Sequence, residues 1–149
     1  MIYIAHRGNI NGRIPEKENH PDYIDKSILE GFEVEIDLWF INNKFILGHD
    51  EPQYEIKFSL LCNPYIWVHA KDIDAFEIVV NRELKGFWHT NEDFVLTTWK
   101  HVWTYPGKTL IDGAIAVLPE TVSNYSVRDL KRCSAICSDE VQKFKELLK

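Results

Sequence analysis

Acidic side chains that alternate with apolar ones in residues 33–39 are the most unusual feature of this sequence. Glu33, Glu35 and Asp37 occupy every second position, and because strand side chains point to opposite faces in turn, the three acids share one face. If that face is buried, the carboxylates repel one another unless a cation neutralises them, and hard divalent cations prefer carboxylate oxygens. The segment predicts either a metal-binding strand or an antiparallel strand with its acidic face in water.

Two neighbouring apolar runs end in further residues that can do chemistry. The run 2–5 leads into His6 and Arg7, and the run 45–48 leads into His49. In α/β proteins ligands bind at the C-terminal ends of the strands. A lone histidine is more often structural, but two histidines that flank an acidic pair predict an acid/base site.

The order and spacing of these residues resemble the glycerophosphodiester phosphodiesterase family, in the same superfamily as phosphatidylinositol-specific phospholipase C. The resemblance covers residues 2–50 and rests on the motifs His6-Arg7-Gly8, Glu18-Asn19, Glu35-x-Asp37 and Gly48-His49-Asp50. It implies a TIM barrel with a site for Ca²⁺ or Mg²⁺. Residue by residue, it implies acid/base roles for His6 and His49, phosphate binding by Arg7 and metal binding by Glu35 and Asp37.

The resemblance is limited beyond residue 50. The sequence also departs from the family's motifs at two places, one before residue 50 and one after it. Residues 15–19 hold two residues more than the family's Pro-Glu-Asn, and we align Glu18 with the family's glutamate because it directly precedes Asn19. A solvated charged loop is the alternative for this segment. At residues 69–71 the family has Glu-x-Lys, so His69 replaces a metal-binding glutamate while Lys71 is kept to bind phosphate. The expected metal ligands are therefore Glu18, Glu35, Asp37 and His69, for Mg²⁺, Ca²⁺ or Mn²⁺.

Length and composition limit the class of protein. The 149 residues, 45% of them hydrophobic, predict one domain over 1–149 with a sizeable core. The net charge of −6 argues against nucleic acid and anionic membranes as partners. No apolar run approaches the ~18 residues of a membrane span, so a cytoplasmic protein is expected, with its oligomeric state left open. Cys62, Cys133 and Cys137 are expected to be reduced core residues.

The apolar runs define the expected fold. Eight of them predict strands, at 2–5, 33–38, 45–48, 66–70, 86–89, 102–105, 114–118 and 134–137. Helices are expected at 21–31, 72–84, 127–133 and 138–148. A TIM barrel usually needs about 250 residues, and the links after residues 41 and 90 are too short for helices. We therefore expect an α/β fold, a reduced TIM-like barrel from which some helices are missing.

These features predict a metal-dependent phosphoric diester hydrolase acting on a small glycerophosphodiester-like molecule. His89 and Tyr105 are further residues that could reach an anionic substrate, although a structural role is the alternative for His89. A catalytically inactive module that binds a phosphate-bearing ligand is the other candidate class, favoured by the missing glutamate at position 69 and the short chain. Retention of both histidines favours the enzyme, because binding alone needs no acid/base pair.

Overall fold

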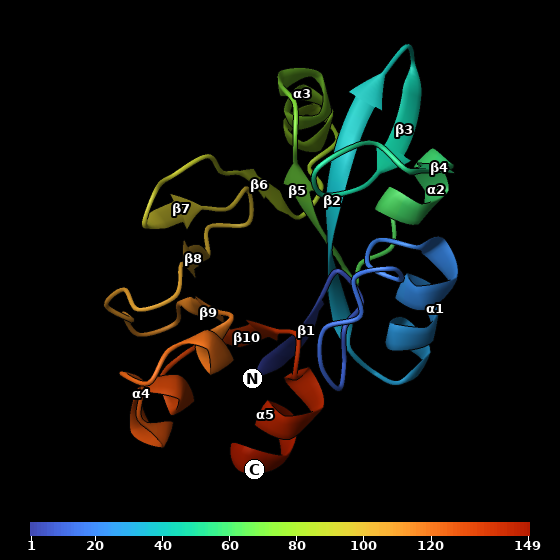
Figure 1. The fold of residues 1–149 in the computed structure, drawn as a ribbon. Helices are drawn as coiled ribbons and strands as arrows, with labels where there is room; N and C mark the ends of the chain where they lie inside the picture. Colours follow the sequence, from blue (N-terminus) through green and yellow to red (C-terminus); the bar gives the residue numbers. More distant parts are fainter.

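A computed structural model describes residues 1–149 as one curled sheet of ten strands with short helices on its outer side (Figure 1). Three strands run antiparallel to their neighbours: β3 (Lys44–Leu47) on β2, β4 (Tyr54–Ile56) on β3, and β7 (Phe94–Leu96) on β8. The remaining strands are parallel and follow the order β6 (Gly86–Trp88), β5 (Ile66–Ala70), β2 (Glu33–Ile41), β1 (Ile2–His6), β10 (Ala135–Ser138), β9 (Ile115–Val117) and β8 (Val102–Thr104).

The expected reduced TIM-like barrel is wrong. The sheet is a mixed, curled half-barrel: no strand pairing joins β6 to β7, and the chain passes through β6, β7, β8 and β9 without an intervening helix. The physical reason is chain length. Eight strand–helix units need at least about 200 residues, and between β6 and β8 this chain uses the short strand β7 where a crossover helix would lie.

The helices are short and begin where the sequence supplies caps. In α3, the Asp72 carboxylate accepts a hydrogen bond from Ala75 N (2.7 Å) and another from Phe40 N (2.8 Å), so it caps the helix and also fixes it to β2. Pro21 occupies the first turn of α1. The helices are α1 (Pro21–Leu29), α2 (Phe58–Leu61), α3 (Ile73–Asn81), α4 (Val127–Lys131) and α5 (Val141–Leu147), with a 3₁₀ turn η1 (Pro119–Thr121).

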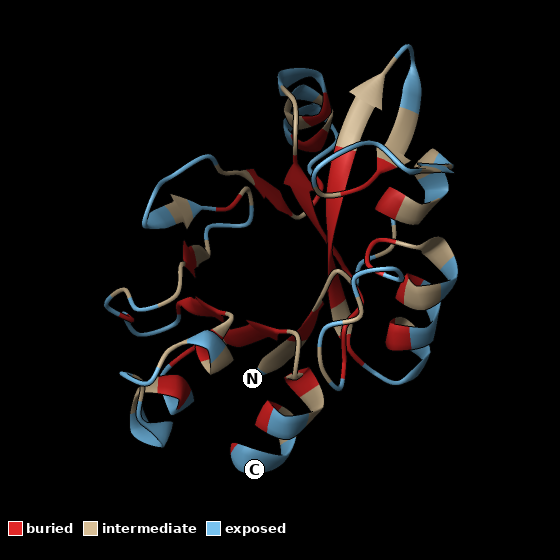
Figure 2. Cartoon of the chain, viewed as in Figure 1, coloured by how far each residue is buried: buried red, intermediate tan, exposed pale blue.

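The buried residues lie mainly on the strands and on one side of the helices, and the exposed residues lie mainly on the helices and loops (Figure 2). The largest cluster packs β2 and β5 against α1 and α3. A second cluster includes Trp67, Phe87 and Trp103, which come from the parallel strands β5, β6 and β8. A salt bridge of 2.9 Å from Lys85 to Glu33 neutralises the first of the three acids on β2. Glu33 is therefore held by a cation of its own, Lys85.

Two expectations about composition can be compared with the structure. All three cysteines are free; Cys133 and Cys137 are buried as expected, whereas Cys62 is exposed, so the expectation of a core position is wrong for it. None of the helices combines the length and the apolar character that crossing a membrane requires.

Candidate functional site

Strand register brings the candidate side chains together from distant parts of the sequence. In the parallel pairs, β1 aligns His6 with Glu35 of β2, and β5 aligns His69 with Asp37 of β2. Side chains at matched positions of neighbouring strands lie side by side on the same face. The four residues therefore meet at the C-terminal end of the parallel strands, where the sequence placed them.

A pocket of about 370 Å³ lies at this end of the sheet. Its two walls come from different strands and differ in chemistry. The first wall comes from the ends of β1, β3 and β5 and from the first half of β2, and is formed by His6, Arg7, Glu35, His49, His69 and Lys71. The second wall, from β6, β8, β9 and the residues after them, is formed by Phe87, His89, Thr90, Trp103, Tyr105, Val117 and Leu118.

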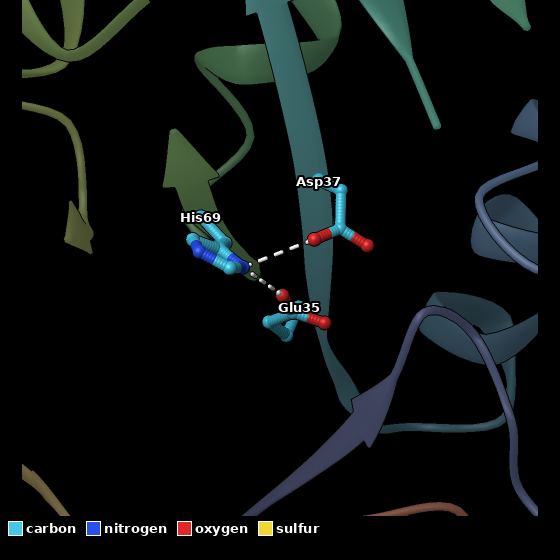
Figure 3. Close-up of side chains that lie close together, drawn as sticks. All are labelled: Glu35, Asp37 and His69. Atoms are coloured by element: carbon cyan, nitrogen blue, oxygen red, sulfur yellow. Dashed lines mark ion pairs between the residues drawn. The ribbon is translucent and has the colours of Figure 1, made fainter. Parts of the chain in front are cut away.

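Glu35, Asp37 and His69 form a compact cluster beside the pocket (Figure 3). His69 Nδ1 lies 3.0 Å from Asp37 Oδ1 and 3.8 Å from Glu35 Oε1. One ligand atom from each of the three residues lies within 4.8 Å of the others. The His69 ring is held in place by stacking on Phe87, with ring centroids 4.9 Å apart.

The two carboxylates of this cluster experience opposite electrostatic environments. Burial raises the pKa of Glu35, and the neighbouring charge of Asp37 raises it further. Burial also disfavours the charged form of Asp37, but the close contact with His69 and the positive charge of Arg7 outweigh it and hold the pKa of Asp37 well below its usual range. Asp37 is thus the ionised anchor of the cluster, whereas Glu35 lacks a close cationic partner.

The cluster fits a divalent cation. Asp37 Oδ1 is fully buried and has no hydrogen-bond partner of good geometry, and the nearest ionisable nitrogen to a Glu35 oxygen is 3.8 Å away. Both oxygens point toward the same space as His69 Nδ1 (Figure 3). Two carboxylates and one imidazole are ligands that Mn²⁺ and Mg²⁺ accept, and the imidazole favours the transition metal.

His6 is oriented by a residue that the sequence did not single out. Asp139 Oδ1 lies 2.8 Å from His6 Nδ1, and His6 Nε2 faces Glu35 Oε2 at 3.9 Å. Burial opposes charge on His6, but the hydrogen bond to Asp139 and the charge of Glu35 outweigh it, so the pKa of His6 is raised. Asp139 lies at the start of the helix expected over 138–148, where Ser138 and Asp139 are typical cap residues; instead α5 begins at Val141, and the residue before it is Glu140, whose side chain makes no cap.

We expect Asp139→Asn to lower the pKa of His6, because the carboxylate that stabilises the protonated imidazole is removed. The readout is the titration of the His6 ring signal by NMR, which does not depend on any activity. Asp50→Asn is the matched control: Asp50 lies 2.7 Å from His49 Nδ1 and should leave the titration of His6 unchanged. An unaltered His6 midpoint in Asp139→Asn would show that Asp139 does not control this histidine.

Arg7 and Glu18 form a second charged group beside the cluster. Arg7 Nε lies 2.9 Å from Asp37 Oδ2, and Arg7 Nη1 donates to Glu18 Oε2 at 3.1 Å. Glu18 also accepts hydrogen bonds from Arg13 (2.8 Å) and Asn9 (3.1 Å). Burial is outweighed by the hydrogen bonds from Arg13 and Arg7, and the pKa of Glu18 is lowered. The structure thus pairs Glu18 with guanidinium groups and does not bring it into the Glu35–Asp37–His69 cluster.

Asn19 connects the loop before α1 to the cluster, a contact that we did not predict. Its side-chain NH₂ donates to Asp37 Oδ2 and its side-chain oxygen accepts from Asp37 N, both at 2.9 Å. Asn19 adopts a left-handed backbone conformation with φ of 62°, which asparagine tolerates better than most residues. Glu18 therefore holds Arg7 in place, and the neighbouring Asn19 holds Asp37.

His49 and Lys71 complete the first wall. His49 follows Gly48, which has φ of +152°, and a Cβ at this position would lie 2.0 Å from Glu51 O, so only glycine fits. Burial lowers the pKa of His49. Lys71 Nζ lies 3.6 Å from Asp37 Oδ1. All the predicted site residues except Glu18 and the fully buried Asp37 line the pocket itself.

Comparisons with protein-family models, with curated proteins and with solved structures found no match to this chain. The family resemblance of residues 2–50 therefore stays a resemblance, and the pocket's own geometry is what indicates a function.

Proposed function

We propose that this chain is a metal-dependent phosphodiesterase that cleaves a small glycerophosphodiester-like molecule with two histidines as acid and base. The observation that carries the proposal is that two imidazoles, a guanidinium and an ammonium line one pocket: His6, His49, Arg7 and Lys71. Cleavage of a phosphodiester requires neutralisation of its charge, a proton acceptor for the attacking oxygen and a proton donor for the leaving oxygen. This wall carries a residue type for each requirement.

The positive side chains bind the phosphate. Arg7 offers a planar fork of donors and Lys71 a single point charge. Both are already oriented by Asp37, since Arg7 Nε lies 2.9 Å and Lys71 Nζ 3.6 Å from its carboxylate oxygens. A divalent cation held by Glu35, Asp37 and His69 would supply further charge neutralisation of the phosphoryl oxygens.

The histidines move the protons. One imidazole takes the proton from the attacking hydroxyl or water, and the other gives a proton to the leaving alcohol. His6 is fixed by Asp139, and His49 by its position after Gly48 and its 2.7 Å contact with Asp50. A histidine held by a carboxylate keeps one ring nitrogen free and correctly oriented for proton transfer.

The second candidate is a protein that uses the same residues to bind a ligand but does not cleave it. It is favoured by the imidazole at position 69, which adds no negative charge, and by the contacts of Arg7, which is already paired with Asp37 and Glu18. Such a protein would hold a phosphate-bearing ligand in the pocket without cleaving it.

A screen of the purified protein tests the proposal. Glycerophosphodiesters and a chromogenic phosphodiester are incubated with the protein, with and without Mg²⁺, Ca²⁺ and Mn²⁺. The proposal expects turnover that requires an added ion and is lost in the presence of a chelator. Binding of the diesters without turnover under any of these conditions would support the binding protein, and neither binding nor turnover would overturn both candidates.

The imidazole at position 69 gives a prediction about metal preference. We expect the unmodified protein to bind Mn²⁺ more tightly than Ca²⁺, because the site has one negative charge fewer than a site of three carboxylates and imidazole suits transition metals. His69→Glu should shift the preference toward Ca²⁺ and Mg²⁺ in a calorimetric titration. His89→Glu is the control, because it adds a carboxylate to the same pocket at a residue outside the cluster. It should leave the metal preference unchanged. Tight Ca²⁺ binding that His69→Glu leaves unchanged would show that residue 69 is not a ligand.

A further inference from the structure

The second wall of the pocket is aromatic and apolar, and the proposed chemistry does not use it. Phe87 and Trp103 are 2% and 1% exposed, so they form the floor, and Tyr105 is half-buried beside them. Val117 and Leu118 from the end of β9 complete the apolar surface. The only carboxylate that lines the pocket is Glu35, on the opposite wall. This wall therefore suits an uncharged, apolar part of a ligand.

The rings of this wall are fixed in place by one another. Phe87 and Trp103 lie with centroids 4.3 Å apart, and the His89 and Tyr105 rings stack at 3.6 Å with an angle of 15°. His89 Nε2 lies 2.9 Å from the carbonyl oxygen of Glu92, and burial lowers the pKa of His89, which favours the neutral ring. A surface held rigid before binding costs less ordering entropy when a ligand arrives.

A second cavity next to the pocket has a different lining. A smaller cavity of about 110 Å³ shares Arg7 and His49 with the pocket and has no hydrophobic residue in its lining, which includes Arg13, Asp50 and Gln53. A phosphate bound at Arg7 and His49 would therefore lie next to both a large, ring-lined space and a small, polar space. A phosphodiester has two ester groups, one for each side.

We infer that the pocket selects asymmetric phosphodiesters in which one alcohol carries a neutral aromatic ring and the other is small and polar. The ring lies against Tyr105 and the floor of Phe87 and Trp103, and the polar alcohol enters the smaller cavity. This inference rests on the proposed function, because it assumes that the first wall binds a phosphodiester. Tyr105 is the residue that determines this specificity, since its ring is the more accessible part of the aromatic surface.

The test compares three diesters of glycerol phosphate. Their second alcohol is 2-phenylethanol, ethanol or choline, so they differ only in carrying an aromatic ring, a small alkyl group or a cation. Binding is measured by calorimetry and hydrolysis by the release of alcohol, both in the presence of Mn²⁺. The phenylethyl ester should be favoured over the ethyl ester by about tenfold. Tyr105→Leu should reduce this ratio severalfold, whereas Tyr105→Phe, which keeps the ring, should preserve it. The thermal midpoint of each variant shows whether it is folded.

The outcomes separate this inference from the proposed function. Preferential binding of the phenylethyl ester without hydrolysis supports the inference and overturns the phosphodiesterase. Hydrolysis of all esters at equal kcat/KM, or a preference for the choline ester, overturns the inference and leaves the phosphodiesterase standing. If no ester binds, both are overturned. A phenylethyl preference on the unmodified protein that persists in Tyr105→Leu would overturn the assignment to Tyr105.

Discussion

Replacing either His6 or His49 by alanine is expected to lower the turnover of a phosphodiester by roughly 10²–10⁴-fold. Each imidazole lines the pocket, and loss of either one removes a proton acceptor or a proton donor from the reaction. Neither ring belongs to the apolar core clusters, so the thermal midpoint of His49→Ala should change little, whereas His6→Ala also leaves Asp139 without its partner and should lower the midpoint moderately. Turnover and midpoint are measured on the same preparations, so that activity can be expressed per folded molecule.

His20→Ala is the matched control for these two variants. His20 lies outside the pocket, at the start of α1, where its ring accepts a hydrogen bond from Asp22 N. Its replacement should leave turnover close to that of the unmodified protein. The acid/base assignment is contradicted if His6→Ala and His49→Ala lower the midpoint but keep full activity per folded molecule.

The two carboxylates of the cluster should respond oppositely to loss of charge in metal-free protein. Asp37 is fully buried and lies against Arg7, Lys71 and His69. Asp37→Asn removes their shared counter-charge, and breaking a buried ion pair costs roughly 3–5 kcal/mol, a fall of about 10 °C in the thermal midpoint for a chain of this size. Glu35→Gln should raise the midpoint at neutral pH, because burial and the charge of Asp37 raise the pKa of Glu35 and its ionised form therefore destabilises the folded state.

Added Mn²⁺ distinguishes this explanation from a simple difference in packing. A ligand that binds only the folded state raises its midpoint, so Mn²⁺ should stabilise the unmodified protein and fail to stabilise Glu35→Gln. Glu33→Gln is the control on the same strand, since Glu33 pairs with Lys85 outside the cluster. If Asp37→Asn and Glu35→Gln lower the midpoint equally, the two carboxylates do not have the different environments described above.

Much of the secondary structure could be predicted because most elements carry a strong local signal. The eight expected strands and the hairpin of β2 and β3 are present. The strands β4 and β7 and the helix α2 were missed; each has only three or four residues and at most one that is buried. The prediction that the sheet closes into a barrel was wrong. The number of strands does not determine whether β6 and β7 pair, and the local sequence pattern contains no information about that pairing.

The site could be predicted where its residues follow strands that align in register. His6 and His69 lie at the ends of two apolar runs and Glu35 lies near the start of a third, and the parallel pairing brings these positions together. Asp139 was missed because it stands 133 residues from His6 and precedes an apolar helix, where an aspartate is typical of a cap. His89 and Tyr105 of the second wall were identified, but Phe87 and Trp103 were missed because core rings and ligand-binding rings have the same periodicity in sequence.

The most direct measurement of the central claim is phosphorus NMR of one glycerophosphodiester mixed with the protein and Mg²⁺, an ion that broadens the signal less than Mn²⁺. The account predicts that the diester signal disappears over time and that a phosphomonoester or cyclic phosphate signal replaces it. The conversion should stop when a chelator is added and should slow in the His6→Ala variant by roughly 10²–10⁴-fold. A diester signal that shifts on binding but keeps its full intensity with stoichiometric protein would contradict the account, because the pocket would then bind its ligand without cleaving it.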